Sequence, residues 1–213
     1  MENILVAGAN GTTGRKIVNL LKASQYFNPI AMVRKETQIN QFKSEGIETV
    51  LADLTKDLTH TIEGVDKVIF AAGSGGKNVV EVDQEGAKRL MAVSKMGNVK
   101  RFVMLSSMGA DNPEAVEDLK DYMKAKQNAD EHLMNIGLKY AIVRPGTLNN
   151  SEGKGKIELK DKLNRQGEIS RADVAQTLVR ALHDDAPYNK TFEILEGDTL
   201  IGEAMKELKT NVN

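Results

Sequence analysis

Short runs of consecutive apolar residues recur along the first two thirds of the chain. In the stretches between them, apolar and polar residues follow a different spacing. Each run is rich in Val, Ile, Leu or Phe and shows little alternation with polar residues, which is typical of strands covered on both faces. The runs are residues 3–8, NILVAG; 29–34, PIAMVR; 48–53, ETVLAD; 67–73, KVIFAAG; 101–107, RFVMLSS; and 139–146, KYAIVRPG. We expect each of them to form a buried strand.

Between most of these runs, apolar residues recur every three or four positions, as on one face of a helix. Such stripes lie at residues 17–21 and at residues 87–94, just before Gly97. A further helix is expected at residues 121–133, DYMKAKQNADEHL, ending near Gly137, because glycine commonly follows the last helical residue. Strands that alternate with helices predict an α/β fold with a parallel sheet covered on both sides.

No internal repeat, low-complexity segment or linker rich in Pro and Gly divides the chain, so we interpret residues 1–213 as one domain. After Gly146 the sequence becomes more polar, and we expect a small C-terminal substrate region. Residues 149–168, NNSEGKGKIELKDKLNRQGE, predict a surface loop, with room for a hairpin; the alternative is a flexible excursion that helps form a substrate lid. Ser170 and Asp173 have capping-box spacing before an apolar-striped helix.

Composition narrows the classes of function. Hydrophobic residues make up 40% and charged residues 28% of the chain, as in ordinary soluble proteins. The formal net charge of −1 argues against a general nucleic-acid binder, which needs a basic surplus. No signal-peptide pattern and no apolar stretch of bilayer length is visible, so we expect no membrane association. Cysteine is absent, which excludes disulfides and suits the reducing cytoplasm, where we expect the protein to act.

The first expected strand leads directly into a glycine-rich turn and a helix, in residues 4–18, ILVAGANGTTGRKIV. Glycine permits unusual dihedral angles, lets a diphosphate approach the backbone, and allows close packing of helix and strand. The N–H groups at the helix start attract an anion. The spacing is G-x-x-G-x-x-G rather than G-x-G-x-x-G, and a structural turn without a ligand is the alternative. We expect a dinucleotide to contact Gly8, Asn10, Gly11, Thr12, Thr13 and Gly14.

The end of the second expected strand favours NADP over NAD. An NAD site usually has Asp or Glu about 20 residues beyond the glycines, whereas here Arg34 and Lys35 stand at the strand tip without an acid. The guanidinium of Arg34 can pair with a 2′-phosphate, and Arg15 in the first helix could add a second positive contact. The alternative is that both arginines are solvated surface charges.

Two further strand ends add expected cofactor contacts. Asp53 could accept a hydrogen bond from the adenine amine, or it could cap the following turn. AAGSGG, residues 71–76, contains side chains too small to block a cofactor at the carboxyl edge of the sheet; a flexible turn is the alternative. We expect the cofactor to be lined here by Asp53, Leu54, Ala71, Ala72 and Gly73.

These motifs occur in a familiar order from end to end: GANGTTG, Arg34, ADL, AAGSGG, VDQEGA, MLSSMGA, YMKAK, YAIVRPGTL and ISRADVA. The chain resembles a short atypical member of the short-chain dehydrogenase/reductase superfamily, in the NAD(P)H-binding group related to biliverdin reductase B and NmrA-like proteins. The resemblance implies a Rossmann fold, with a dinucleotide across the carboxyl ends of the strands. It leaves the substrate open, because related folds serve many functions.

In the Y-x-x-x-K pattern of that superfamily, tyrosine exchanges a proton with the substrate oxygen, and lysine binds the nicotinamide ribose. Tyr122 and Lys126 match it, and residues four apart share one helix face. A free tyrosine has a pKa of ~10, so a nearby cation would help it exchange protons; an exposed helix face is the alternative. The superfamily's serine corresponds to Ser106 or Ser107, and we assign Ser107 to the substrate and Ser106 to the cofactor. Capping of the strand end is the alternative for both serines.

Pro145 and Gly146 resemble the superfamily's loop beside the nicotinamide, unless they only end the strand. The histidines are scattered without companions, so we expect no metal site. The leading hypothesis is an NAD(P)H-dependent oxidoreductase, with NADP preferred, that acts on a small carbonyl-type substrate. The alternatives are an NADP-binding redox-sensing regulator without turnover and a sugar-nucleotide epimerase or dehydratase. The latter relatives carry a large substrate region, whereas only residues 147–213 follow Gly146 here.

Overall fold

The computed structural model describes residues 1–115 and 117–210 and contains every one of the six expected strands. They pair in parallel in the order β3-β2-β1-β4-β5-β6, which confirms a doubly wound sheet of the Rossmann type. Their bounds are β1 (Glu2–Ala7), β2 (Phe27–Val33), β3 (Glu48–Leu51), β4 (Lys67–Phe70), β5 (Arg101–Leu105) and β6 (Tyr140–Pro145). The strand order reverses between β1 and β4, where such sheets bind ligands at the carboxyl ends.

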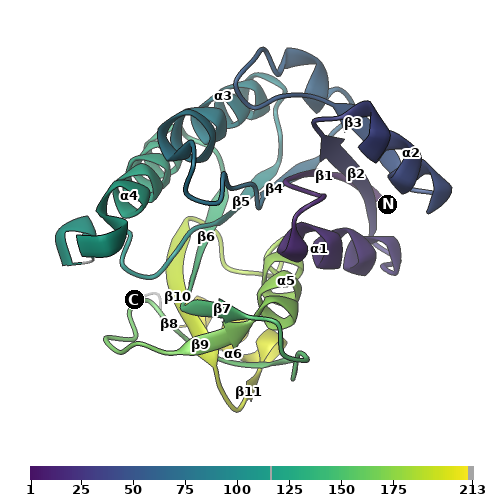
Figure 1. The fold of residues 1–213 in the computed structure, drawn as a ribbon. Helices are drawn as coiled ribbons and strands as arrows, with labels where there is room; N and C mark the ends of the chain where they lie inside the picture. The colour runs from purple at the N-terminus through teal and green to yellow at the C-terminus, as the bar shows by residue number, and fades with distance from the viewer. Residues whose placement is uncertain (116, 211–213) are drawn as a thin grey trace.

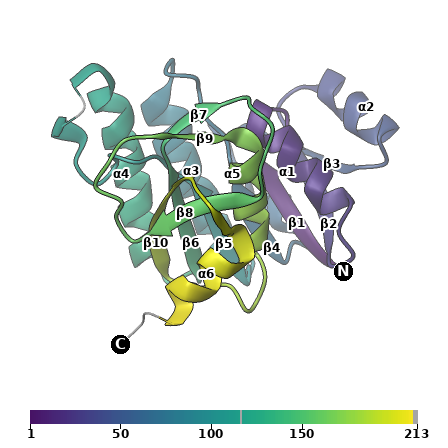
Figure 2. The same ribbon diagram turned by 90° about the horizontal axis from the view of Figure 1, so that it is seen from below.

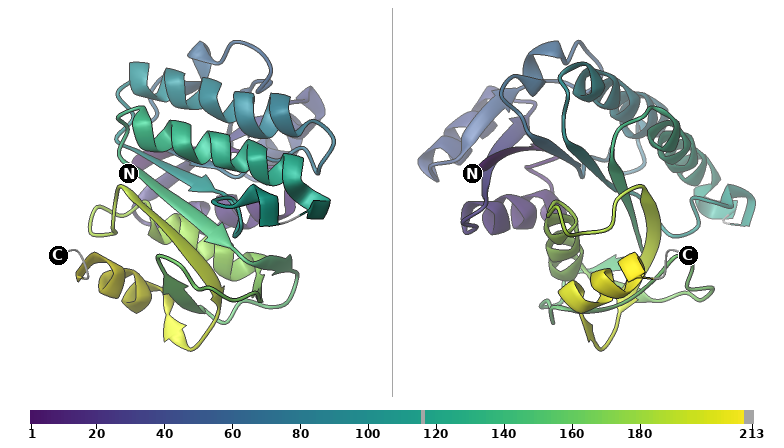
Figure 3. Two further views of the ribbon diagram at one scale, coloured as in Figure 1. Left: turned by 90° about the vertical axis from the view of Figure 1, so that its left-hand side faces the viewer. Right: turned by 180° about the vertical axis from the view of Figure 1, so that it is seen from behind.

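Helices cover both faces of the sheet (Figure 1). Two of them, α3 and α4, lie side by side over one face, and α1 and α5 pack together on the other (Figure 3). Successive residues of β1 point to opposite faces, so Ile4 and Val6 belong to the core under α1 and α5, whereas Leu5 and Ala7 belong to the core under α3 and α4. The α-helices of the described chain are α1 (Thr12–Lys22), α2 (Glu36–Ser44), α3 (Ala87–Met96), α4 (Lys120–Asn135), α5 (Arg171–Arg180) and α6 (Ile201–Thr210).

The helix ends follow the glycine signals of the sequence. After α4 ends at Asn135, Gly137 adopts a φ of 85°, which is the left-handed conformation that favours glycine. Gly97 follows α3 with an ordinary φ of −82°, and Asn98 takes the left-handed conformation with a φ of 55°. At the start of α5, the hydroxyl of Ser170 accepts the backbone N–H of Asp173, which confirms the N-cap.

The segment after Gly146 differs from the expected surface loop. Residues Lys156–Lys160 form β8, which joins the main sheet, and its Ile157 is fully buried. β8 runs antiparallel to β10 (Lys190–Glu196), which itself pairs in parallel with β6. β11 (Thr199–Leu200) adds to β8, and the short strands β7 (Thr147–Asn149) and β9 (Glu168–Ser170) form a separate parallel pair, seen from below in Figure 2. The loop prediction was therefore wrong for residues 156–160.

Short 3₁₀- and π-helical segments complete the connections. Among residues 1–115 and 117–210, the 3₁₀-helices are η1 (Thr59–Ile62), η3 (Pro113–Ala115) and η4 (Glu117–Leu119), and the π-helix is η2 (Val79–Gly86), which leads directly into α3. In the part of the chain that the structure describes, no helix combines the length and apolar character that a membrane crossing requires.

Candidate functional site

The glycines of the first turn are required by close backbone contacts. Gly8 has a φ of 87°, and a Cβ placed there would lie 2.6 Å from the backbone of Ala71 and Ala72 at the end of β4. A Cβ on Gly14 would lie 2.0 Å from the carbonyl oxygen of Gly8, so α1 can approach β1 only with glycine at this position. These contacts bring the ends of β1 and β4 together beside the start of α1.

Gly11 meets a different requirement. A Cβ there would have only one neighbouring atom within 4 Å, the Gly8 carbonyl oxygen at 3.2 Å. Gly11 is the N-cap residue of α1, and no side chain caps the helix, so its first N–H groups are open to a ligand. Exposed helix N–H groups and the absence of a side chain suit a diphosphate at this turn. Thr12 is exposed beside it, and Thr13 is buried in the first turn of the helix.

A pocket of about 510 Å³ opens from this turn along the carboxyl ends of β1 to β4. It brings together the sequence-predicted residues Gly8, Asn10, Gly11, Arg34, Asp53, Leu54, Ala72 and Gly73. Its other lining residues are Met32, Val33, Gln38, Ala52, Ser74, Lys77, Asn78 and Val82. Ala71 forms the backbone floor against Gly8 without lining this pocket. The glycine-rich turn at residues 8–14 and this pocket together fit the adenosine and diphosphate portion of a dinucleotide.

The positive charge at the pocket comes from two elements. Arg34 is exposed at the end of β2, and its backbone N–H donates to Oε1 of Gln38, so α2 fixes the strand tip. Lys77 reaches the same pocket from the loop after β4. Sequence reasoning missed Lys77 and Gln38, because a lysine in a Gly-rich loop and a glutamine in a polar helix carry no signal of their own.

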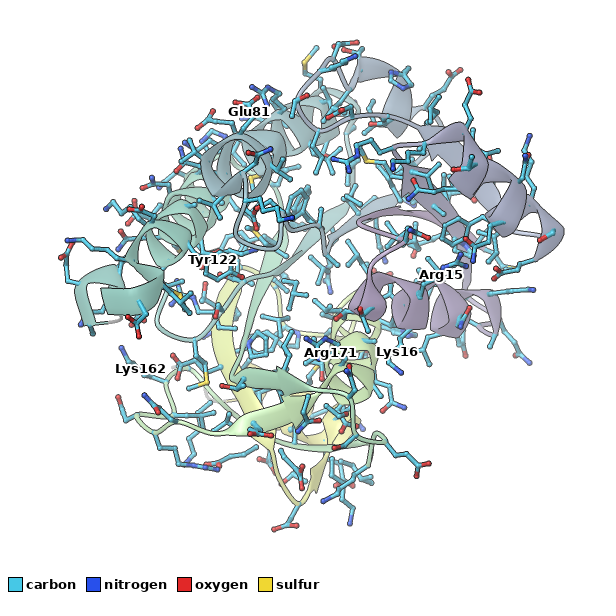
Figure 4. All side chains as sticks on the ribbon, viewed as in Figure 1. Arg15, Lys16, Glu81, Tyr122, Lys162 and Arg171 are labelled. Carbon is cyan, nitrogen blue, oxygen red and sulfur yellow. The ribbon has the colours of Figure 1, made fainter. Side chains whose placement is uncertain are left out.

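Arg15 is engaged away from the pocket. Its Nη1 donates to Oε1 of Glu45 at 2.9 Å, and its guanidinium carbon lies 3.8 Å from the centroid of the Phe42 ring. Figure 4 shows Arg15 on the side of α1 that faces α2. The pocket lining does not include Arg15. In this structure the residue joins α1 to α2, and the second positive contact to a 2′-phosphate stays a prediction.

Asp53 caps the turn that follows β3, as the second of the two sequence interpretations expected. Its Oδ1 accepts the backbone N–H and the hydroxyl of Thr55, both at 2.9 Å. The Thr55 backbone N–H is the main cause that holds the pKa of Asp53 below its usual range, and Arg34 contributes by its charge. Asp53 nevertheless lines the pocket, so its capping role is compatible with the predicted contact to the cofactor.

Lys126 is one of the few lysines in the described chain that are almost fully buried, with 3% of its surface exposed. Its Nζ donates to the Leu105 carbonyl oxygen at 3.3 Å and lies 3.8 Å from Oδ1 of Asp83. The same Nζ lies 5.6 Å from the centroid of the Tyr122 ring. The exposed-face alternative therefore fails for Lys126. Tyr122 is half-buried and lies on the inner side of α4 (Figure 4).

The two serines after β5 point in different directions. Ser106 is buried, and its hydroxyl donates to Oδ2 of Asp130 at 2.8 Å. The same oxygen accepts Nε and Nη2 of Arg144, and burial raises the pKa of Asp130 against the effect of that arginine. Ser107 is half-buried, with only a 3.3 Å bond from its hydroxyl to the Met108 carbonyl oxygen, so its hydroxyl is the freer of the two.

Pro145 and Gly146 stand at the carboxyl end of β6. Pro145 is buried and accepts the Met108 N–H, which fixes the loop that carries Ser107. A Cβ on Gly146 would lie 2.4 Å from the Gly167 carbonyl oxygen and from the Leu195 side chain, so packing alone requires glycine here. The structure thus places Ser107, Tyr122, Lys126 and Pro145 on adjacent elements at the carboxyl edge, next to the dinucleotide pocket.

The fold and this edge define a dinucleotide-binding protein of the Rossmann class. The chain belongs to the NAD(P)H-binding family, which matches residues 8–185. This assignment confirms the resemblance to atypical short-chain dehydrogenases/reductases. The matched residues 8–185 include the pocket lining, the two serines, the tyrosine–lysine pair and the Pro-Gly loop.

Relatives carry names from two kinds of enzyme. A Bacillus subtilis protein named as an uncharacterized sugar epimerase, YhfK, is 39% identical over 96% of this chain and 99% of its own. A Bacillus halodurans protein described as a candidate NAD-dependent epimerase/dehydratase has a TM-score of 0.93 at 34% identity, over 98% of this chain and 100% of its own. The oxidoreductase ylbE from Lactococcus lactis has a TM-score of 0.89 at 30% identity, over 99% and 98% of the two chains.

Proposed function

We propose that this protein is an NADP-preferring oxidoreductase that exchanges hydride between the cofactor and a small carbonyl-type substrate. The observation that carries the proposal is the arrangement of two sites along one sheet edge. The pocket with Arg34 lies at the ends of β1 to β4, and the Tyr122–Lys126 pair lies beside the ends of β5 and β6. A dinucleotide bound at the glycine turn can span such an edge.

Each residue has a defined task in this proposal. The N–H groups at the start of α1 bind the diphosphate, and Arg34, with Lys77, binds the 2′-phosphate by charge-assisted hydrogen bonds. When bound, the nicotinamide supplies or accepts the hydride. The Tyr122 hydroxyl supplies the proton to the substrate oxygen, and the Ser107 hydroxyl orients that oxygen. The buried Lys126 ammonium offers positive charge beside the tyrosine and hydrogen bonds to the ribose.

A sugar epimerase or dehydratase is the second candidate, favoured by the name of the Bacillus subtilis relative. The arrangement of the C-terminal strands and helix favours the oxidoreductase instead. β8, β10, β11 and α6 extend and cover the main sheet, and only the short β7–β9 pair is added near the carboxyl edge. Little of the described chain is therefore available to enclose a nucleotide-linked sugar, whereas a small carbonyl compound needs less enclosure.

Titration with NADPH and NADH, followed by turnover assays, tests the proposal. We expect saturable binding of NADPH with weaker binding of NADH, and oxidation of NADPH in the presence of an aldehyde, quinone or flavin from a panel. Net oxidation distinguishes an oxidoreductase from an epimerase, which returns its cofactor unchanged in each cycle. Absence of binding would overturn the proposal, and tight binding without turnover on the whole panel would favour the redox-sensing regulator.

A further inference from the structure

The π-helix η2 carries a buried carboxylate that the proposed mechanism does not use. π-Helical turns are rare and often occur at functional sites. Asp83 lies in the middle of η2 and is 1% exposed. A carboxylate removed from water is costly unless charges or hydrogen bonds compensate it. The partners of Asp83 therefore indicate what this turn is for.

The two oxygens of Asp83 face two different parts of the site. Oδ2 accepts the backbone N–H of Ser74 at 2.9 Å, and Ser74 lines the dinucleotide pocket. Oδ1 has no hydrogen-bond partner and lies 3.8 Å from Nζ of Lys126. A Cβ on Gly73, which also lines the pocket, would lie 3.2 Å from the same Oδ1. Asp83 thus lies directly between the pocket loop after β4 and the lysine of α4.

Lys126 depends on this carboxylate for its charge balance. Its ammonium is almost fully buried and has a single long hydrogen bond, to the Leu105 carbonyl oxygen. Asp130 also acts on Lys126 by its charge, but one of its oxygens already accepts Ser106 and two nitrogens of Arg144. Asp83 has no other cation within ion-pair distance among the described residues, so it is the counter-charge available to Lys126.

A second contact fixes η2 against α4. Oε1 of Gln84 accepts the Asn128 side-chain amide at 2.7 Å, half a helical turn beyond Lys126. On its other side η2 packs on the loop after β3, where a Cβ on Gly86 would lie 2.8 Å from Cβ of Leu54. The π-helix is therefore held from both sides, and it carries Asp83 as a rigid connection between the cofactor pocket and the catalytic helix.

We infer that Asp83 is a positioning residue that holds Lys126 in place through its charge and holds the pocket loop through the Ser74 N–H. The assignment of Lys126 to the cofactor rests on the proposed oxidoreductase function, whereas the Asp83–Lys126 coupling does not. Each oxygen has one task, so the two tasks can be separated by substitution. In Asp83→Asn the amide oxygen can still accept the Ser74 N–H, but its NH₂ group replaces the negative charge beside Lys126.

The first test is a double-mutant cycle in thermal stability, measured without cofactor or substrate. Asp83→Asn and Lys126→Met should each lower Tm by roughly 10 °C, because breaking a buried ion pair leaves one charge uncompensated. The double variant Asp83→Asn/Lys126→Met should lower Tm by no more than half of the sum of the two single losses, since neither charge remains.

Glu81→Gln is the matched control, because Glu81 is exposed on the same π-helix and pairs with Arg89. The Tm of this control should stay within a few degrees of the wild-type value. Additive losses in the double variant would overturn the inference.

The second test separates positioning from a purely structural role. Asp83→Asn should lower kcat at least tenfold while KM for NADPH rises less, by about threefold, because the Ser74 bond survives and only the ribose bond of Lys126 is weakened. Asp83→Ala should raise KM further, and Asp83→Glu should restore part of kcat. Equal changes of kcat and KM in Asp83→Asn would contradict the division of tasks. If no turnover is found with any substrate, the proposed function fails, but the stability cycle still decides the coupling.

Discussion

Arg34 provides the sharpest test of cofactor preference, because it lines the pocket and its side chain makes no hydrogen bond or ion pair among the described contacts, acting only by its charge on Asp53. Arg34 is exposed and lines the pocket, and the hydrogen bond that it donates comes from its backbone N–H, to Oε1 of Gln38. Arg34→Ala therefore removes positive charge without breaking a side-chain bond of the fold. The 2′-phosphate is absent from NADH, so NADH serves as an internal reference.

The size of the effect follows from the exposure of the site. A hydrogen bond to a charged group contributes about 1.5–3 kcal/mol, and an exposed, solvent-screened pair belongs at the lower end of that range. At about 1.4 kcal/mol per tenfold change in Kd, the loss in NADPH affinity should be roughly tenfold to thirtyfold. Lys77 lines the same pocket and remains, so some preference for NADPH should survive.

Fluorescence or calorimetric titration of both cofactors, at low salt and at high salt, measures the effect. Lys35→Ala is the matched control, because Lys35 is the next residue, is exposed, and does not line the pocket. Wild-type protein and the control should lose NADPH affinity as salt rises, whereas Arg34→Ala should show a weaker salt dependence. Equal losses for NADPH and NADH in Arg34→Ala, or the same loss in Lys35→Ala, would refute the 2′-phosphate role.

Three further outcomes follow from the site and the fold. Tyr122→Phe should abolish turnover with cofactor Kd nearly unchanged; a Phe variant of full rate would remove this hydroxyl from the mechanism. Gly14→Ala should destabilise the protein in thermal unfolding although alanine favours helices, because its Cβ would lie 2.0 Å from a carbonyl oxygen. Burial lowers the pKa of His183 below its usual value, with Arg180 adding to the effect. The neutral ring is thus favoured in the fold, so this residue's contribution to stability is present above about pH 6.5 and is lost as pH falls through the lowered pKa. An NMR titration that gave His183 an ordinary pKa would contradict this reasoning.

The strands and the first turn could be predicted because their signals are local. Apolar runs without alternation identified β1 to β6, and the sequence of strand, glycines and helix identified the turn at Gly8 and Gly14. β8 was not predicted, because its sequence, KIELK, is short and charged. Its alternation of polar and apolar residues nevertheless places Ile157 in the core. Its pairing partner, β10, lies some thirty residues further on, and nothing local specifies that partner.

The partners of charged side chains could not be predicted in the same way. The sequence supplied Arg34 as the expected partner of a 2′-phosphate and Arg15 as a second positive contact, but contacts with Glu45 and Phe42 turn Arg15 toward α2. It also left Asp83 unremarked inside VDQEGA, since burial on a π-helix depends on how η2 packs against α4 and the pocket loop. An ion pair forms between residues that the fold brings together, whatever their separation along the chain.

By itself, the sequence determined that strands and helices alternate, that glycine must occupy the first turn, and that Tyr122 and Lys126 share one helix face. These properties depend on backbone sterics and on periodicity, which act over a few residues. The tertiary structure alone decided that Lys126 is buried against Asp83, that Lys77 joins Arg34 at one pocket, and that the polar C-terminal segment completes the sheet. Burial and charge pairing depend on distances between elements, and those distances exist only once the elements have packed.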